Sequence, residues 1–281
     1  VRAERTVRDY GVHTGPGAAA GPFAVLTRFA PSVSIHALGT FQVVRDGEAV
    51  PKNAWQSKKA RDLLKILVAR RRPVPRERLI ELLWPDSDPS QAGNRLSVLL
   101  STVRDVLQPR GRRSDDGPLV TDDTSVWLDL ARVRIDVEEF LAEATAALGA
   151  DRDHHPDATA QLAVAERMVC GDFLEGDPHQ EWAVPVGEAV RATHIAVLRA
   201  LSARLRAGGD LDGAVGCTLR LLQHDPYDEQ AHLDLVAIQL EAGHHGEAHR
   251  RYRIYVQQMA EFGVEPRPLK QLSGQFCRVG G

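Results

Sequence analysis

Polar side chains on one face of an expected helix are the part of this chain best suited to chemistry. Residues 88–107 read DPSQAGNRLSVLLSTVRDVL. Asp88 can cap a helix N-terminus, Pro89 suits the first helical position, and Gln91 follows three residues after Asp88, as in a capping box. One face of this helix carries side chains that can hydrogen-bond base edges in a DNA major groove: Asn94, Arg95, Ser97, Ser101 and Arg104.

The other face of the same helix is apolar. Its members recur at helical spacing: Leu96, Leu99, Leu100, Val103, Val106 and Leu107. An ordinary amphipathic helix with a solvated polar face shows the same pattern, and the negative charge of Asp105 counts against DNA. The helix alone leaves both interpretations open, and the flanking sequence has to decide between them.

The flanking sequence predicts a winged helix-turn-helix. Residues 33–50 alternate and turn at Asp46-Gly47, which is typical of a small antiparallel sheet with a tight hairpin. Residues 55–69 and 76–84 are each expected to form a helix before the helix at 88–107. Residues 119–121 and 126–128 then read as a second hairpin. A sheet, three helices and a hairpin occur in this order in a winged helix.

Basic side chains of this half are candidates for contact with DNA phosphates. The first helix is expected to turn Lys58, Lys59, Arg61 and Lys65 outward, and the first three of these are the candidates for phosphate contact. Arg112 and Arg113 follow in the polar loop between the third helix and the hairpin. Phosphate positioning is the functional interpretation. The alternative is a solvated surface.

Charge is distributed unevenly along the 281 residues. Residues 33–128 carry 16 Lys and Arg against 12 Asp and Glu, whereas residues 129–281 carry 15 against 24. A basic module joined to an acidic one is typical of a DNA-binding domain with an interaction domain. With 26% charged and 43% hydrophobic residues, the composition predicts a soluble globular protein of two or three domains.

The second half is expected to be all α-helical. Gly209 and Ala214 recur as Gly243 and Ala248 after a shift of 34 residues, which is the period of tetratricopeptide repeats. Such helix pairs stack into surfaces that bind proteins. Residues 1–31, rich in Gly, Ala and Pro, are expected to be a flexible leader or linker.

Enzyme and metal signatures are not found in the sequence. It contains neither the GxxxxGK[ST] phosphate-binding motif nor the GxSxG motif of serine hydrolases. Two pairs of histidines, 154–155 and 244–245, are adjacent instead of spaced for one helix face, and surface loops are the better interpretation. Three cysteines without CxxC spacing fit a reducing cytoplasm. We expect no catalytic residues, no metal and no cofactor.

Several segments in a fixed order resemble one protein family. They are VSIHALGTFQVVRDG (33–47), WQSKKARDLLKILV (55–68), RERLIELLWPD (76–86), AGNRLSVLLSTVRDVL (92–107), VWLD (126–129), VEEFL (137–141), GDFLEGD (171–177) and FGVEP (262–266). Over residues 33–270 the chain resembles the Streptomyces antibiotic regulatory protein family of transcriptional activators. The resemblance implies a fold that is mainly α with small β-sheets. A response-regulator-type winged helix (32–130) would precede a tetratricopeptide-like bacterial transcriptional activator domain (131–274) and a short tail (275–281).

The resemblance also implies a mechanism. Such activators bind direct repeats of double-stranded DNA near a promoter, as dimers, and recruit RNA polymerase through its sigma factor. By position, the polar face of the third helix would read bases, and Thr121 would approach the DNA backbone. The loop before that helix would contact polymerase: Pro85, Asp86, Ser87, Asp88 and Gln91. Gly93, Thr102 and Asp105 stand where many members of the family carry basic side chains, which leaves the set of base contacts open.

The expected function is therefore a cytoplasmic, nucleoid-associated transcriptional activator that binds promoter DNA specifically. The alternative is a tetratricopeptide-like scaffold or ligand sensor in which the winged domain contacts protein. Salt dependence separates the two, because DNA binding through several phosphates weakens steeply as salt rises.

Overall fold

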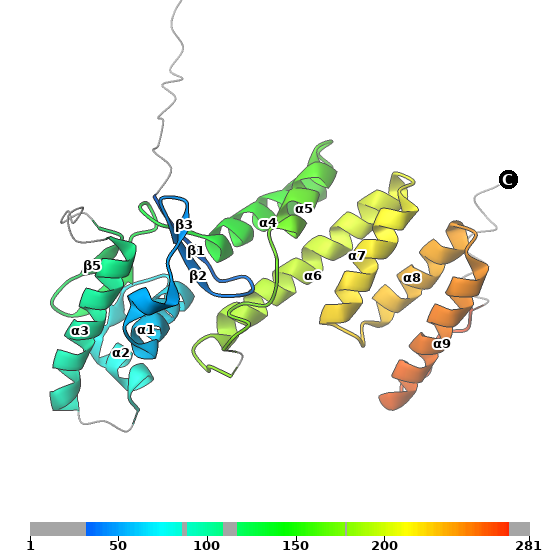
Figure 1. Cartoon of the computed structure of the whole chain (residues 1–281). Helices are drawn as coiled ribbons and strands as arrows, with labels where there is room; N and C mark the ends of the chain where they lie inside the picture. The colour runs from blue at the N-terminus through cyan, green and yellow to red at the C-terminus, as the bar shows by residue number, and fades with distance from the viewer. Residues whose placement is uncertain (1–31, 86–88, 109–116, 178, 270–281) are drawn as a thin grey trace, which may run out of the picture. The chain divides into compact units, whose positions relative to one another are not determined.

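A computed structural model describes residues 32–85, 89–108, 117–177 and 179–269 (Figure 1). It begins with a four-stranded sheet in the order β3-β2-β1-β7. The strands β1 (Val33–His36), β2 (Gln42–Arg45) and β3 (Glu48–Ala49) are antiparallel, as the sequence predicted. Asp46 and Gly47 both have positive φ, +50° and +84°, which is the conformation of a two-residue hairpin turn.

The fourth strand of this sheet was not predicted. Strand β7 (Arg134–Ile135) pairs in parallel with β1, with Ser34 opposite Arg134 and Ile35 opposite Ile135. It lies beyond residue 130, where we expected the first domain to end. The sheet therefore takes in residues from both sides of that expected boundary.

Three helices and a hairpin complete the winged-helix half, as predicted, and a short strand that was not predicted joins the hairpin in a second sheet. The helices are α1 (Lys58–Arg70), α2 (Arg76–Leu83) and α3 (Pro89–Leu107), with a 3₁₀ turn, η1 (Lys52–Trp55), before α1. The second sheet has the order β4-β6-β5, from β4 (Val74–Pro75), β5 (Leu119–Thr121) and β6 (Ser125–Leu128). Ser57 caps α1 by accepting the backbone N–H of Ala60, and Arg71 ends it in a left-handed conformation.

The second half is helical, which confirms the predicted fold class. Its helices are α4 (Asp136–Arg152), α5 (Ala158–Arg167), α6 (Val184–Ala207), α7 (Leu211–His224), α8 (Glu229–Glu241) and α9 (His245–Glu261). The helices that the repeat relates, α6 with α7 and α8 with α9, lie side by side as hairpins (Figure 1). Gly209 and Gly243 have positive φ at the turn of each hairpin, and Ala214 and Ala248 are fully buried where the helices pack.

The first helix departs from the prediction at its start and at one side chain. It begins at Lys58, because Trp55 belongs to the 3₁₀ turn η1. Lys65 was expected on the outward face, but its side chain is only 5% exposed. It forms an ion pair with Asp177, in the segment between α5 and α6, and its ammonium lies 5.3 Å from the centre of the Phe41 ring. A buried lysine requires such partners because an unpaired charge in the interior is costly.

The segment after α5 is connected to the first sheet by backbone hydrogen bonds. Gly39 donates its N–H to Asp172, and Leu174 donates to Ala37, both at 2.8 Å. The approach is so close that a Cβ on Gly171 would lie 2.9 Å from the Cα of Gly39, which no side-chain-bearing residue tolerates without movement. Buried apolar residues of the winged-helix half and of the helices up to the start of α8 form one continuous core, and Leu233, Tyr255 and Met259 form a second, smaller cluster between α8 and α9.

A buried histidine lies among α4, α6 and α7. His194 is 4% exposed and packs edge-on against Phe140 and His224, with ring centroids 6.2 and 4.9 Å away. Its two ring nitrogens have no hydrogen-bond partner among the described residues. Burial lowers the pKa of His194 to about 4, helped by the nearby charges of His224 and Arg220.

This histidine should make the fold sensitive to acid. Because the pKa of His194 is lower in the folded chain than its ordinary value of 6.5, only the unfolded chain gains a proton as pH falls from 6.5 to about 4. We expect the substitution His194→Leu to remove that dependence, so that the stability of the variant relative to the wild type rises by up to about 3 kcal/mol across this range. Urea unfolding at several pH values measures it, with the exposed His249→Leu as control. Parallel pH profiles of wild type and His194→Leu would contradict the prediction.

Candidate nucleic-acid interface

The polar face of α3 lies on the surface and its apolar face in the core, as the periodicity predicted. Asn94, Arg95 and Ser97 are exposed, whereas Ser101 and Arg104 are half-buried. The buried residues of the helix are Ala92, Leu96, Leu99, Leu100, Thr102, Val103, Val106 and Leu107. Thr102 is the exception among them: its hydroxyl donates to the carbonyl of Val98 at 3.2 Å, one turn earlier. Packing of this face fixes which side of α3 a DNA groove can meet.

Val98 was missed by the sequence analysis. It is 64% exposed and lies on the same side of α3 as Asn94 and Ser101, about one turn of helix from each. An exposed valine in a row of hydrogen-bonding side chains presents an apolar contact, and the apolar feature of the major groove is the C5-methyl group of thymine. Its only signal in the sequence is a valine that falls outside the apolar period.

Arg104 connects α3 to the wing, which is the hairpin of β5 and β6. Its guanidinium donates to the hydroxyl of Thr121, on β5, at 2.6 Å. Two residues predicted separately for DNA contact therefore contact each other. A guanidinium has five N–H donors, so this bond leaves Arg104 with donors to spare. The bond also fixes the distance between α3 and the hairpin.

The turn of the wing is held by local hydrogen bonds. One oxygen of the Asp122 carboxylate accepts the backbone N–H groups of Thr124, at 2.8 Å, and Ser125, at 2.5 Å. These bonds lower the pKa of Asp122, because they stabilise its charged form. The start of α2 also contacts the turn, since Arg76 donates its backbone N–H to the carbonyl of Thr124 at 2.8 Å.

The cations of α1 differ in their availability. Lys58 is exposed at the start of the helix. Lys59 is exposed too, but its ammonium donates to the carbonyl of Leu83 at 2.5 Å, at the end of α2. The Arg61 guanidinium donates to the carbonyl of Phe41 at 2.7 Å and lies over its ring. The geometry gives Arg61 a role within the fold, and Lys58 remains the cation of α1 most open to a phosphate.

Other predicted site residues lie outside the described part of the chain. These are Arg112, Arg113, Asp86, Ser87 and Asp88, together with the side chain of Gln91. Pro85 is exposed at the end of the described segment that follows α2. The predicted polymerase-contacting loop and the predicted phosphate contacts of residues 112 and 113 thus stay predictions.

Comparison with known proteins assigns the helical half. Residues 135–273 match the family model of the bacterial transcriptional activator domain. The second half of the chain is a bacterial transcriptional activator domain. A search of curated proteins finds no match to this chain.

A solved structure matches both halves. It is EmbR of Mycobacterium tuberculosis in complex with a low-affinity phosphopeptide, with a TM-score of 0.72 at 24% sequence identity. The match covers 89% of this chain, and the chain spans 66% of the length of that structure. At this identity the likeness establishes the fold. The domain and the fold together support a transcriptional regulator of the Streptomyces antibiotic regulatory protein type, as the resemblance implied.

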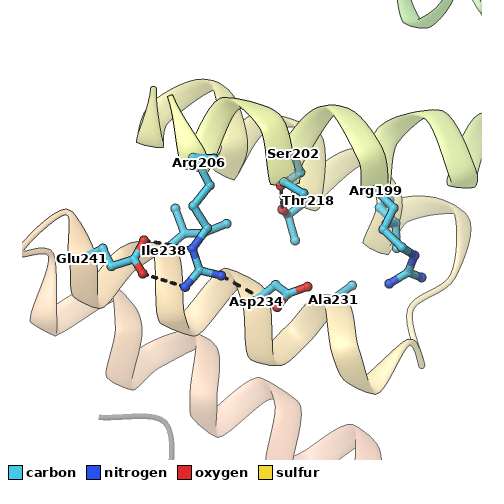
Figure 2. Close-up of a pocket in the computed structure, with 11 residues that line it drawn as sticks. Arg199, Ser202, Arg206, Thr218, Ala231, Asp234, Ile238 and Glu241 are labelled. Carbon is cyan, nitrogen blue, oxygen red and sulfur yellow. Dashed lines mark hydrogen bonds and ion pairs between the residues drawn. The ribbon is translucent and has the colours of Figure 1, made fainter. Parts of the chain in front are cut away.

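The activator domain has a concave groove of about 480 Å³ between α6, α7 and α8. Figure 2 shows Arg206 reaching across it from α6 to α8. Its guanidinium donates to both carboxylate oxygens of Glu241, at 2.6 and 2.9 Å, which raises the pKa of Arg206. On the same side Arg199 forms an ion pair with Asp228. The arginines of the groove thus come from α6, its carboxylates Asp234 and Glu241 come from α8, and their charges balance one another.

Neither a metal site nor a membrane span is found in the described residues. No group of three or more His, Cys, Asp or Glu side chains there is arranged to hold a metal ion. None of the helices in the described ranges is both long enough and apolar enough to cross a membrane.

The bond between α3 and the wing can be tested by removing its acceptor. We expect Thr121→Val to lower the free energy of unfolding by about 1–2 kcal/mol, because the half-buried Arg104 loses a hydrogen-bond partner. Urea unfolding measures the loss. Thr145→Val, which removes a hydroxyl bonded only within α4, is the matched control. An unchanged stability of Thr121→Val would mean that the bond contributes nothing.

Proposed function

We propose that this chain is a sequence-specific transcriptional activator that binds direct repeats near a promoter and recruits RNA polymerase. The observation that carries the proposal is the exposed polar face of α3, held beside a wing in a chain that also has a transcriptional activator domain. The exposed side chains of Asn94, Arg95 and Ser97 offer hydrogen-bond donors and acceptors that take no part in the packing of the core.

In this proposal α3 enters the major groove. Arg95 would bind guanine in a bidentate manner or reach a phosphate, and Asn94 would bind adenine through its amide. Ser97, whose hydroxyl donates to the carbonyl of Gly93 at 3.1 Å, can rotate toward a base or phosphate. Ser101 and Arg104 are half-buried nearer the C-terminus of α3 and would meet the edge of the DNA major groove. Each good bidentate contact contributes on the order of 1–3 kcal/mol of discrimination.

Affinity independent of sequence would come from cations outside α3. Lys58 and Lys59 on α1, with Arg112 and Arg113, would neutralise phosphates on the DNA backbone, and Thr121 would approach the backbone from the wing. These contacts orient the protein on the duplex without reading it. One winged domain reads only a short site, so useful specificity requires two protomers, which we place head-to-tail on direct repeats.

Recruitment of polymerase would use two surfaces. The segment that starts at Pro85 and reaches Gln91 in the first turn of α3 would meet the sigma factor bound next to the site. The acidic activator domain would supply contacts between protomers and to polymerase. A protein of this kind needs no catalytic residue and no cofactor, because it acts by placing one macromolecule beside another.

A scaffold function is the second candidate. The groove of the activator domain favours it, because charges of both signs around the apolar side chains of Leu221 and Ile238 suit a peptide segment. In that case the winged half would contact protein, and the chain would have no affinity for DNA.

In vitro selection from a random duplex pool at about 150 mM salt decides between the candidates. The expected result is a short motif in direct repeat, whose affinity falls with salt at a log–log slope of about −0.9 for each phosphate neutralised. Retention of no motif, together with no retention at low salt, would reject the DNA-binding proposal and favour the scaffold.

The exposed Val98 leads to a prediction about a single methyl group of the DNA. If its side chain contacts a thymine methyl, replacing that thymine by deoxyuridine removes the contact without changing any hydrogen bond. We expect wild-type affinity to fall by about three- to tenfold at one thymine of the selected site, in keeping with about 1 kcal/mol for a buried methyl group. Val98→Ala should bind the two duplexes with nearly equal affinity. Equal sensitivity of both proteins at every thymine would exclude this role.

A further inference from the structure

Three arginines line a hollow between the end of α1 and the start of α2. The hollow has a volume of about 390 Å³ and is lined by Arg70, Arg72, Pro73, Val74, Pro75 and Arg78. No acidic side chain of the described residues lines it. The groove of the activator domain, by contrast, pairs its arginines with carboxylates.

The backbone at Arg71 creates this arrangement. Arg71 adopts a left-handed conformation, with φ of +53°, and ends α1 by donating its N–H to the carbonyl of Leu67 at 2.9 Å. Its own side chain leaves the hollow and pairs with Glu138 on α4 at 2.6 Å. Its neighbours Arg70 and Arg72 line the hollow instead, and the side chain of neither has a hydrogen bond or ion pair to any other described residue.

A purely structural role explains only part of this set. Cations near a helix C-terminus are favourable because they lie beside unpaired carbonyls, and Arg70 and Arg72 at the end of α1 fit that role. Arg78 does not fit it, since it belongs to the first turn of the next helix. The convergence of all three on one hollow therefore requires another reason.

The start of α2 adds hydrogen-bond donors at the same place. Pro75 occupies the N-cap position, and no side chain there accepts a hydrogen bond from the first turn. The backbone N–H of Arg76 is used by Thr124, which leaves the next N–H groups without a side-chain cap. A helix N-terminus that is open in this way favours an anion, most of all one with several acceptor oxygens.

The acids near the hollow do not neutralise it. Glu81 pairs with Arg78 at 2.7 Å, but both side chains are exposed, at 63% and 54%, and such pairs exchange partners readily. Glu77 is exposed on α2 and lies outside the lining. An arginine can bind two oxygens of one phosphate at once, so these three side chains can surround a single phosphate group.

We propose that this hollow binds one phosphate of the DNA backbone. The inference rests on the proposed function and adds to it a specific contact on the wing side of the domain. Val74 and Pro75, which line the hollow, belong to β4 and pair with Val126 and Ser125 of the wing strand β6. Because the hollow lies next to the wing, a DNA duplex whose backbone contacts the wing would also pass beside the hollow.

A backbone phosphate fits the hollow better than a free phosphorylated metabolite. Small ligands are bound in clefts that bury most of their surface against apolar and aromatic walls. Here the apolar lining consists of Pro73, Val74 and Pro75, and two of the three arginines, Arg72 and Arg78, are exposed. The hollow offers positive charge but no apolar surface that could cover the non-phosphate part of such a metabolite. A DNA strand needs only its phosphate group to be bound there.

Neutral backbone substitution in the selected duplex tests the proposal. Each phosphate in turn is replaced by a methylphosphonate, and binding is measured with the full chain and with Arg70→Gln, Arg72→Gln and Arg78→Gln. We expect one position at which the wild type loses about tenfold in affinity, as for one charge-assisted hydrogen bond, and at which Arg72→Gln loses less than about twofold. All three variants should weaken binding to specific and random duplexes alike.

The controls separate this inference from the proposed function. Arg253→Gln, which removes an exposed arginine of α9, should bind as the wild type does, and thermal unfolding should show all the variants folded. If the wild type binds duplex DNA but the three variants match it at every methylphosphonate position, the inference is wrong and the proposed function stands. If the wild type binds no duplex, both fail. Inorganic phosphate that binds the wild type but not the variants, with DNA affinity unchanged, would assign the hollow to a free phosphorylated ligand and overturn the proposal.

Discussion

The carboxylate of Asp136 determines how the two halves of this protein are joined. It accepts the backbone N–H groups of Ala37 and Leu38, at the end of β1, at 2.8–3.0 Å, and that of Val137 in its own helix at 2.8 Å. Burial raises the pKa of this carboxyl, while the same N–H groups oppose the rise by stabilising its charged form. Since α4 begins at Asp136, the first sheet sets both the position and the direction of the first helix of the activator domain.

Typical interaction free energies indicate which contacts hold the two halves of the protein together. A hydrogen bond to a charged group contributes about 1.5–3 kcal/mol, whereas an exposed ion pair contributes about 0–1 kcal/mol. The three bonds of Asp136 and the buried pair of Lys65 with Asp177 therefore outweigh the more exposed pair of Arg71 with Glu138. With the close approach of Gly39 and Gly171, they leave little freedom between the sheet and the segment after α5. If the winged half binds DNA as proposed, these contacts would hold the start of the activator domain close to the duplex.

Local features of the fold were predictable from the sequence, and contacts between distant segments were not. Helical spacing gave the correct two faces of α3, Asp46-Gly47 gave the hairpin, and the 34-residue shift gave the paired helices. The partners of Asp136 and Lys65 lie 99 and 112 residues away, and nothing in the pattern around either residue marks such a partner. Lys65 was placed outward because lysine is ordinarily exposed. The parallel pairing of β7 escaped prediction because two residues carry no periodicity.

The candidate site divides its chemistry among elements that the fold holds together. In the proposed function, the side chains that read bases lie on α3, while the cations that bind phosphates lie on α1, at the turn before α2 and in the segment after α3. Sequence patterns indicated the first group because a single helix contains it. They missed the hollow of Arg70, Arg72 and Arg78, because the fold forms it by bringing the end of α1 close to the start of α2. The bonds from Arg104 to Thr121 and from Arg76 to the wing turn connect these elements. A phosphate bound at the hollow would therefore fix the register in which α3 meets the bases, so that affinity and discrimination depend on the same rigid frame.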